Sequence, residues 1–219
     1  MTDIQRTYLP AAGKNWALPL YDPLMKLLGF DTTKRVLIEQ ANLAPGHRVL
    51  EIGCGTGTLA TMIKRQYPNI EVVGLDPDPS ALARARRKSA RAAVSIRFDQ
   101  GFADELPYSE ACFDRVFSSF MFHHLHAELR EKTLREVRRV LAVGGSFHLI
   151  DLARPEERAA GRWARLVYSS PQLKDNMDSR ILSLLSQVGF ARPTKAKEET
   201  ILFGAFRVAF YQASVASAR

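Results

Sequence analysis

The chain has 219 residues, of which 46% are hydrophobic, and it carries a formal net charge of +8. This length and composition fit one globular domain with a sizeable core, and the lack of internal repeats excludes a repeat protein. The apolar stretches are short and interrupted by charges, so no membrane-spanning helix is expected.

The N-terminus and the cysteines indicate a cellular compartment. Residues 1–13 lack the basic, apolar and small-residue succession of a secretory signal. Cys54 and Cys112 lie far apart and show no metal-ligand spacing, so they fit a reducing compartment better than a disulfide framework. We therefore expect a cytoplasmic protein.

The positive charge is densest over residues 83–93. A solvated helix face is the favoured interpretation, and an anionic substrate or nucleic acid is the alternative. No interleaved aromatic residues and no known nucleic-acid module accompany this run. The sequence therefore does not favour a nucleic-acid partner.

The predicted elements begin with an N-terminal segment that is helical or irregular up to about residue 45, with its best helical pattern over 32–41. From residue 48 onward, strand-like runs alternate with runs of helical period, which is typical of a parallel sheet covered by helices. Strands are predicted at 48–52, 70–75, 94–98, 114–119 and 146–151. Helices are predicted at 59–67, from Ser80 onward, at 128–141 with an end at Gly144-Gly145, and at 181–189.

The sequence pattern changes in the C-terminal tail. Residues 194–213 alternate β-branched and aromatic residues around Gly204, which predicts two final strands joined by a turn as an antiparallel pair. The whole pattern predicts an α/β fold: a single-domain, Rossmann-like, doubly wound sheet of about seven strands, mostly parallel with an antiparallel C-terminal strand. Residues 1–44 are expected to form a helical cap or lid, and residues 45–219 one globular unit.

Three glycines follow the first predicted strand: Gly53, Gly55 and Gly57. Because glycine lacks a Cβ, they permit a positive φ and let a ligand lie against the backbone, while the free amides of the next helix attract negative charge. In an open parallel sheet, this first strand-to-helix turn lies at the switch point where ligands bind. We therefore expect the ligand site at this turn.

The spacing of this turn differs from the G-x-G-x-x-G of dinucleotide-binding proteins, because the sixth position is Thr58. Glu51, two residues before the first glycine, would repel a pyrophosphate and attract an ammonium group. Asp76 ends the second predicted strand, where a carboxylate can accept hydrogen bonds from both hydroxyls of a ribose. The other role open to Asp76 is that of a turn residue before Pro77. The spacing of the glycines and Glu51 point away from a nicotinamide cofactor.

The chain resembles the class I S-adenosylmethionine-dependent methyltransferases in four successive segments: VLEIGCGTG, VVGLDPD, GFADELPYSEACFDRVFSSFMFHHL and LREVRRVLAVGGSFHLID. The Leu-Pro-Tyr stretch and the His-His-Leu resemble the ubiquinone/menaquinone C-methyltransferase-like branch. The resemblance covers about residues 46–151. It implies an enzyme that binds S-adenosylmethionine and methylates a small-molecule acceptor, with an apolar or quinone-like acceptor preferred.

The resemblance places residues 53–57 against the methionine part of the cofactor and Asp76 on its ribose. After the third strand the family usually reads G-D-A, and its Asp accepts a hydrogen bond from adenine, whereas this chain has Phe102 at that position. Three substitutes are open: Phe102 packs on the purine, the Ala103 amide reaches a ring nitrogen, or Asp104 replaces the acceptor. The implied cofactor-binding residues are Tyr21, Glu51, Gly53, Cys54, Gly55, Gly57, Asp76, Pro77, Gly101, Phe102, Ala103, Ser119, Phe120 and His124.

Methyl transfer from a sulfonium mainly requires alignment in a dry pocket, and it needs a base only when the acceptor must lose a proton. His123 and His124 are the candidate catalytic residues, because imidazole titrates near neutral pH. Their other open roles are to start a helix, to fix a loop or to touch the cofactor. His126 is expected at the surface. No metal is expected, because the three histidines are too close in sequence to converge and no carboxylate follows the fourth strand.

Residues 118–121 read SSFM. Methyltransferases that modify the amino groups of nucleobases or glutamine commonly carry an Asn/Asp-Pro-Pro-aromatic motif at this place. Nucleobase and glutamine acceptors are therefore not expected. The apolar residues between 16 and 30 form either a lid over an apolar acceptor or an ordinary core cap. Two alternatives stay open: a non-catalytic S-adenosylmethionine-binding module, motivated by Phe102, and an RNA methyltransferase that uses the basic face. The protein is expected to be a monomer or a homodimer.

Overall fold

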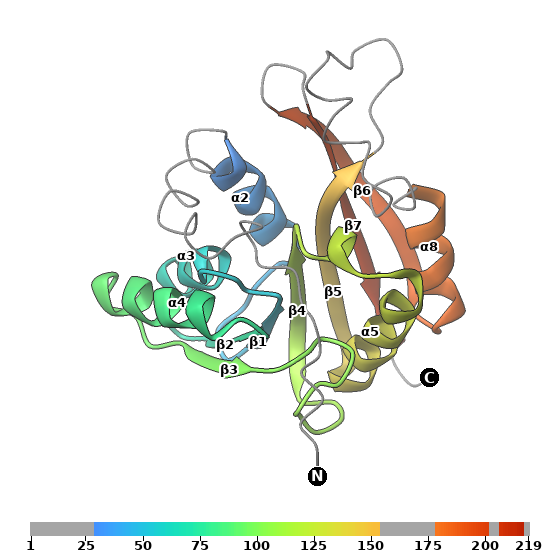
Figure 1. The fold of residues 1–219 in the computed structure, drawn as a ribbon. Coiled ribbons are helices and arrows are strands. Elements are labelled where there is room, and N and C mark those ends of the chain that lie inside the picture. The colour runs from blue at the N-terminus through green and yellow to red at the C-terminus, as the bar shows by residue number, and fades with distance from the viewer. Residues whose placement is uncertain (1–28, 154–177, 202–205, 217–219) are drawn as a thin grey trace, which may run out of the picture.

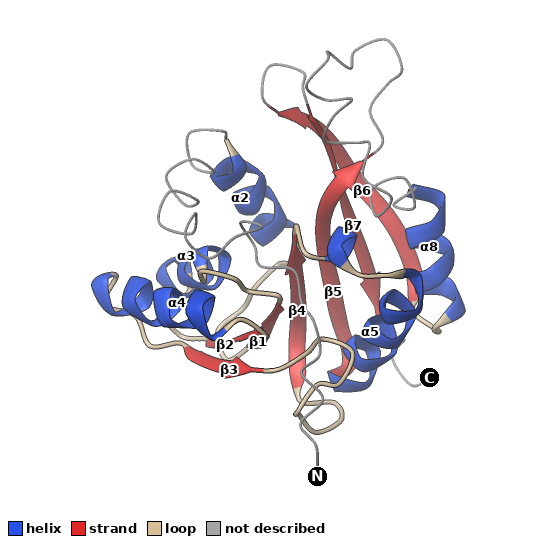
Figure 2. Ribbon diagram, in the orientation of Figure 1, coloured by secondary structure: helices blue, strands red, loops and turns tan. Residues whose placement is uncertain are grey.

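A computed structural model describes residues 29–153, 178–201 and 206–216 (Figures 1 and 2). The seven strands form one sheet in the order β3-β2-β1-β4-β5-β7-β6. Their bounds are β1 (Arg48–Ile52), β2 (Glu71–Asp76), β3 (Arg97–Gln100), β4 (Phe113–Ser119), β5 (Leu141–Ala153), β6 (Ala191–Ile201) and β7 (Phe206–Ser214). Because β1 pairs in parallel with both β2 and β4, the strand order reverses between β1 and β4.

The helices in the described part of the chain are α2 (Phe30–Gln40), α3 (Thr58–Gln66), α4 (Pro79–Arg91), the short 3-10 helix η2 (Phe122–His124), α5 (Ala127–Val140) and α8 (Asp178–Gln187). Successive side chains of a strand point to opposite faces of the sheet. On β4, Val116 joins the core beneath α5 and α8, whereas Phe117 joins the core beneath α2, α3 and α4. Helices therefore cover both faces, as Figure 1 shows, and the prediction of a doubly wound sheet is confirmed.

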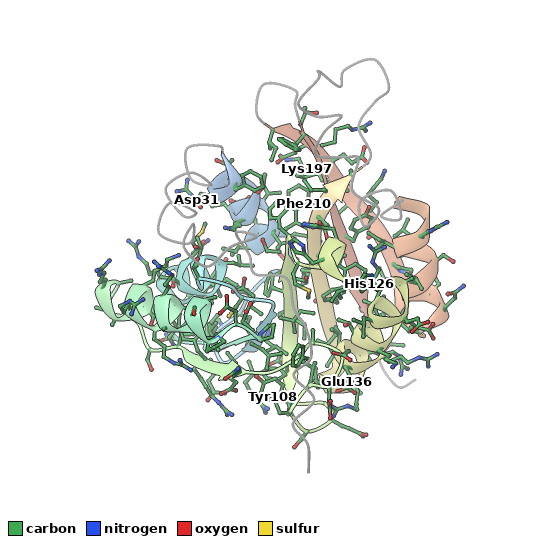
Figure 3. All side chains as sticks on the ribbon, in the orientation of Figure 1. Asp31, Tyr108, His126, Glu136, Lys197 and Phe210 are labelled. Carbon is green, nitrogen blue, oxygen red and sulfur yellow. The ribbon has the colours of Figure 1, made fainter. Side chains whose placement is uncertain are left out.

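The C-terminal strands confirm the predicted antiparallel addition. β7 pairs antiparallel with β5, and β6 pairs antiparallel with β7. β6 is an edge of the sheet and is largely exposed, with Lys195, Lys197, Glu198 and Glu199 along it. Figure 3 labels Lys197 on this edge strand and Phe210, which is fully buried, on β7.

Two predicted boundaries are wrong. The third strand begins at Arg97 rather than residue 94, because Ala93 adopts a φ of +53° and the Val94 amide donates to the Ser89 carbonyl, which closes the end of α4. The helix predicted to reach residue 141 ends at Val140. Leu141 is already extended and pairs with Phe113, so β5 begins directly at the end of α5.

The N-terminal helix predicted at 32–41 is confirmed as α2. Its Leu37 and Ile38 are fully buried in the same core as β1. Residues 1–28 lie outside the described part of the chain, so the division into 1–44 and 45–219 stays a prediction. None of the helices in the described ranges is long and apolar enough to cross a membrane.

Candidate functional site

A cavity of about 210 Å³ lies at the reversal of the strand order. Its walls come from α2, the glycine turn after β1, the loops after β2 and β3, and the segment after β4. In an open α/β sheet this crevice beyond the carboxyl ends of the strands is where ligands bind. The cavity is thus the candidate site on topological grounds alone.

The glycine turn forms the floor of the cavity, and all three of its glycines have positive φ, between 52° and 70°. A Cβ on Gly53 would overlap the Met121 side chain, and a Cβ on Gly57 would lie 2.8 Å from the Ala85 Cβ. A side chain at either position would therefore meet both backbone strain and a steric clash. The predicted positive φ at this turn is confirmed, and the contact of a ligand with its backbone stays a prediction.

Glu51 lies on β1 beneath this turn with only 2% of its surface exposed. Its Oε2 accepts a hydrogen bond of 2.8 Å from the Ala60 amide in α3. Burial raises the pKa of Glu51 to about 8, against the opposing effect of nearby Lys34 and of the Ala60 amide. Burial thus disfavours the charged form of this carboxyl group more than its neighbours favour it. A ligand cation beside it would favour the charged form.

Asp76, the last residue of β2, links the turn to the next helix. Its Oδ2 accepts from the Gly55 amide at 2.7 Å, and its Oδ1 accepts from the Asp78 amide at 2.9 Å. Burial raises the pKa of Asp76, and these two amide hydrogen bonds oppose the rise. Because each carboxylate oxygen has two lone pairs, both oxygens can still accept a ligand hydroxyl.

Two buried oxygens of cavity-lining residues have no hydrogen-bond partner among the described residues. They are Oδ2 of Asp78 and Oγ of Ser119. The other oxygen of Asp78 caps α4 by accepting from the Ser80 amide at 2.8 Å. An unpaired buried acceptor is costly, so these atoms suit a ligand that brings hydrogen-bond donors.

The loop after β3 brings Gly101, Phe102, Ala103 and Asp104 to the cavity wall. The Gly101 amide donates to the Asp76 carbonyl at 3.2 Å, which joins this loop to the end of β2. All three of the substitutes considered for the missing adenine contact are thus at the cavity, and the choice among them stays a prediction.

Beyond β4, Phe120 forms part of the opposite wall. It has a φ of +55°, and its amide donates to the Ile150 carbonyl of β5 at 3.0 Å. Its ring packs edge-on against that of Phe30 from α2, with centroids 4.8 Å apart. The two rings give this side of the cavity an apolar surface.

Asp151 of β5 is fully buried and holds η2 in place. Its carboxylate accepts from the backbone amide of His123 at 2.8 Å and from that of Leu152 at 2.7 Å, and it lies 2.5 Å from the His123 Nδ1. Burial lowers the pKa of His123, but the charge and hydrogen bond of Asp151 raise it, and the net shift is upward. The two residues form a buried hydrogen-bonded pair.

The two histidines of η2 therefore differ. Their ring centroids are 4.0 Å apart, and of the two only His124 lines the cavity. Burial, and after it the neighbouring His123, lowers the pKa of His124 to about 4. At neutral pH the imidazole that faces the cavity is unprotonated and can accept a hydrogen bond.

Most residues named from the sequence gather at this cavity. Those that line it are Glu51, Gly53, Cys54, Gly55, Asp76, Pro77, Gly101, Phe102, Ala103, Ser119, Phe120 and His124. Gly57 caps α3 beside the cavity, and Tyr21 lies outside the described residues.

Burial raises the pKa of the Cys54 thiol, so Cys54 packs rather than reacts. His126, which is labelled in Figure 3, is exposed, as expected, and it also lines the cavity.

The sequence interpretation missed Lys34, Asp78 and Asp151. Phe30 was among the apolar residues predicted to form a lid or a core cap, and it lines the cavity. Lys34 lies four residues after Phe30 on the same helix face, which was a usable signal. Asp151 ends a predicted strand, as Asp76 does. Within the described ranges no three His, Cys, Asp or Glu side chains cluster as a metal site would require.

Comparison with known proteins gives matches over the same region. The family described as "Methyltransferase domain" matches residues 49–145. The demethylmenaquinone methyltransferase of Thermus thermophilus is 37% identical over 153 residues, which cover 68% of this chain and 69% of that protein. The demethylmenaquinone methyltransferase of Deinococcus radiodurans is 35% identical over 153 residues, 68% of this chain and 63% of its own length.

Among solved structures, the YcgJ protein from Bacillus subtilis matches with a TM-score of 0.67. The match covers 86% of this chain and all of that one, at 20% sequence identity. At this identity the likeness concerns the fold. The sheet and its covering helices are those of a known Rossmann-like architecture.

Proposed function

The chain belongs to the S-adenosylmethionine-dependent methyltransferases, with the demethylmenaquinone methyltransferases among its relatives, and from this premise we propose that it methylates a ring carbon of a small quinol. One observation carries the proposal: a single cavity joins buried acids suited to the cofactor with an unprotonated histidine and two aromatic rings suited to the acceptor.

The cavity fits the cofactor. Glu51 would hold the ammonium group of the methionine part, Asp76 would accept the ribose hydroxyls, and the glycine turn would let the chain of the methionine part lie on bare backbone. The unpaired oxygens of Asp78 and Ser119 offer further acceptors. When bound, S-adenosylmethionine supplies a methyl group activated by the sulfonium charge.

The apolar wall of Phe30 and Phe120 would receive the flat ring of the acceptor and exclude water from it. Methylation of a quinol ring carbon forms a carbon–carbon bond, breaks the carbon–sulfur bond and releases one proton. We assign the receipt of that proton to His124, whose lone pair is free at neutral pH. The low basicity of His124 is offset because one positive charge, that of the sulfonium, leaves the cavity as another forms on the imidazole.

The Asp151–His123 pair would act as a positioning pair. It fixes the backbone of η2 through the His123 amide and holds the ring that packs against His124. The Asp151 carboxylate accepts from two backbone amides and lies beside the His123 ring, so its burial does not require a ligand. We propose that this pair holds His124 unprotonated and oriented toward the acceptor.

The test incubates the whole chain with S-adenosylmethionine labelled on its methyl group with deuterium, together with a short-chain demethylmenaquinol kept reduced. Mass spectrometry should find one labelled methyl on the ring, and menaquinol, whose ring carbon is already methylated, should take up none. Label in another compound of a cell extract, but none in the quinol, would replace the acceptor and leave the enzyme class intact.

The same assay decides the alternatives. Label in bulk RNA would support an RNA methyltransferase, and no label in any acceptor would support a non-catalytic binding module. The cytoplasmic location and the monomeric or homodimeric state stay predictions, which fractionation of cells and light scattering would check.

A further inference from the structure

Lys34 is the only lysine or arginine among the described residues that line the cavity. It lies on α2, one turn after Phe30, and its side chain is partly buried. The other charged residues of the cavity wall are acids: Glu51, Asp76 and Asp104 among them. Among the described residues of the cavity wall, Lys34 is thus the lysine or arginine whose charge suits a negative group of a ligand.

The helix that carries Lys34 is held firmly. Its Thr33, Leu37 and Ile38 are buried, and at its end Gln40 donates to the Tyr211 carbonyl at 3.2 Å and contacts the His148 Nδ1 at 3.3 Å. Fixed contacts at both ends of the helix, with Phe30 packed on Phe120, keep Lys34 at one edge of the cavity.

Lys34 and Glu51 both line the cavity. After burial, the charge of Lys34 is the largest influence on the pKa of Glu51, which it lowers. A carboxylate and an ammonium on adjacent walls complement a zwitterion, in which an ammonium and a carboxylate share one carbon. The methionine part of S-adenosylmethionine is such a group.

We propose that Lys34 binds the α-carboxylate of S-adenosylmethionine while Glu51 binds its ammonium group. This assignment rests on the proposed function for the identity of the cofactor, and it makes α2 part of the cofactor site. Lys88, the next basic residue toward Glu51, serves another purpose. Its Nζ donates to the hydroxyls of Thr58 at 2.5 Å and Thr56 at 3.1 Å, and it braces the glycine turn from α4.

The experiment compares Lys34→Gln with the wild-type chain against two ligands: S-adenosylmethionine and its decarboxylated form, which differs only in the missing carboxylate. Calorimetry measures both affinities without any acceptor. We expect the wild type to prefer the complete cofactor by about tenfold or more, and Lys34→Gln to lose most of that preference. Its affinity for the decarboxylated form should stay within about twofold.

Arg35→Gln is the matched control, because Arg35 is on the same helix and exposed. It should leave both affinities unchanged. Lys34→Arg, which keeps the charge, should retain the preference, and thermal melting checks that each variant folds. Equal losses for both ligands, or no loss for either, would overturn the assignment of Lys34. Because the assay uses no acceptor, that outcome would leave the proposed quinol methylation standing, and a failed quinol assay would leave Lys34 standing.

Discussion

Two buried carboxyl groups near the C-terminal ends of parallel strands, Glu51 on β1 and Asp151 on β5, are satisfied in opposite ways. Glu51 accepts a hydrogen bond from one amide, and burial raises its pKa to about 8. Asp151 accepts from two amides and lies 2.5 Å from the ring of His123. In the proposed function, the first acid belongs to a cofactor half of the site, built on β1 to β3, and the second to an acceptor half, built on β4, β5 and η2.

The difference matches the two tasks proposed for these halves, which are to bind the cofactor and to position a reacting group. A buried acid that binds a cation can stay protonated in the free protein and ionise when the ligand arrives. A residue that positions a reacting group must be fixed beforehand, so its counter-charge is built into the protein. Each of the four predictions below breaks or sharpens this contrast.

The largest expected effect is on the acceptor half. Asp151→Asn removes the counter-charge of His123, and we expect the rate of methyl transfer to fall about 100-fold, which is about 2.7 kcal/mol of transition-state stabilisation. His124→Ala should cause a similar loss, and the double variant little more, because the residues act as one unit. Single-turnover kinetics measure the rate, while the affinity for S-adenosylmethionine should change less than twofold. Independent, additive losses would contradict the positioning role.

A smaller effect is expected at the glycine turn. Gly53→Ala should lower the free energy of unfolding by about 2 kcal/mol, because alanine there meets both a positive φ and the Met121 side chain. Gly46 is the control: its φ is +85°, but a Cβ would find nothing within 4 Å. Gly46→Ala should cost about 1 kcal/mol from the backbone alone. Denaturant unfolding measures both, and equal costs would show that Met121 yields easily.

Next in size is the ribose contact. Asp76→Ala should weaken binding of S-adenosylmethionine at least about tenfold, or about 1.4 kcal/mol. A cofactor analogue without the 2′-hydroxyl should bind less tightly to the wild type and lose little more in the variant. Calorimetry tests both. If the wild type and Asp76→Ala bound the complete cofactor equally, the ribose assignment would be lost.

The smallest expected effect is the release of a fraction of a proton when the cofactor binds. With a pKa of about 8, Glu51 is mostly protonated in the free protein at pH 7. A bound ammonium group favours the ionised form, so binding should release about 0.5 to 0.9 proton at pH 7, and affinity should rise from pH 6 to pH 8. Calorimetry in buffers of different ionisation enthalpy measures the release. Glu51→Gln should release none, and a wild type without proton release would remove the contrast with Asp151.

Much of the fold could be predicted because its signals are local. The apolar runs of β1, β2 and β4 and the glycines after β1 depend on short stretches of sequence. The two wrong boundaries have different causes. β3 begins late because of a local contact, in which residues 93 and 94 first close α4. β5 begins early because of a distant one, the pairing of Leu141 with Phe113.

The site divides in the same way. The residues of the cofactor half follow their own strands, so the motifs located them. Lys34 and Asp151 reach the site only through the packing of α2 on the sheet and the pairing of β5 with β4. The four-residue spacing of Phe30 and Lys34 predicts a shared helix face, and Asp151 ends a predicted strand, but neither signal says which part of the sheet the residue meets.

The charged edge of β6 has a consequence for the behaviour of the chain in concentrated solution. An exposed edge strand offers free backbone groups to any other strand, which is a route to aggregation. On β6 another chain would have to cover Lys195 and Lys197 together with Glu198, which already pairs with Arg207 at 2.6 Å. The opposite edge, β3, is only four residues long. Both edges of the sheet are thus unfavourable templates for the addition of strands from other copies of the chain.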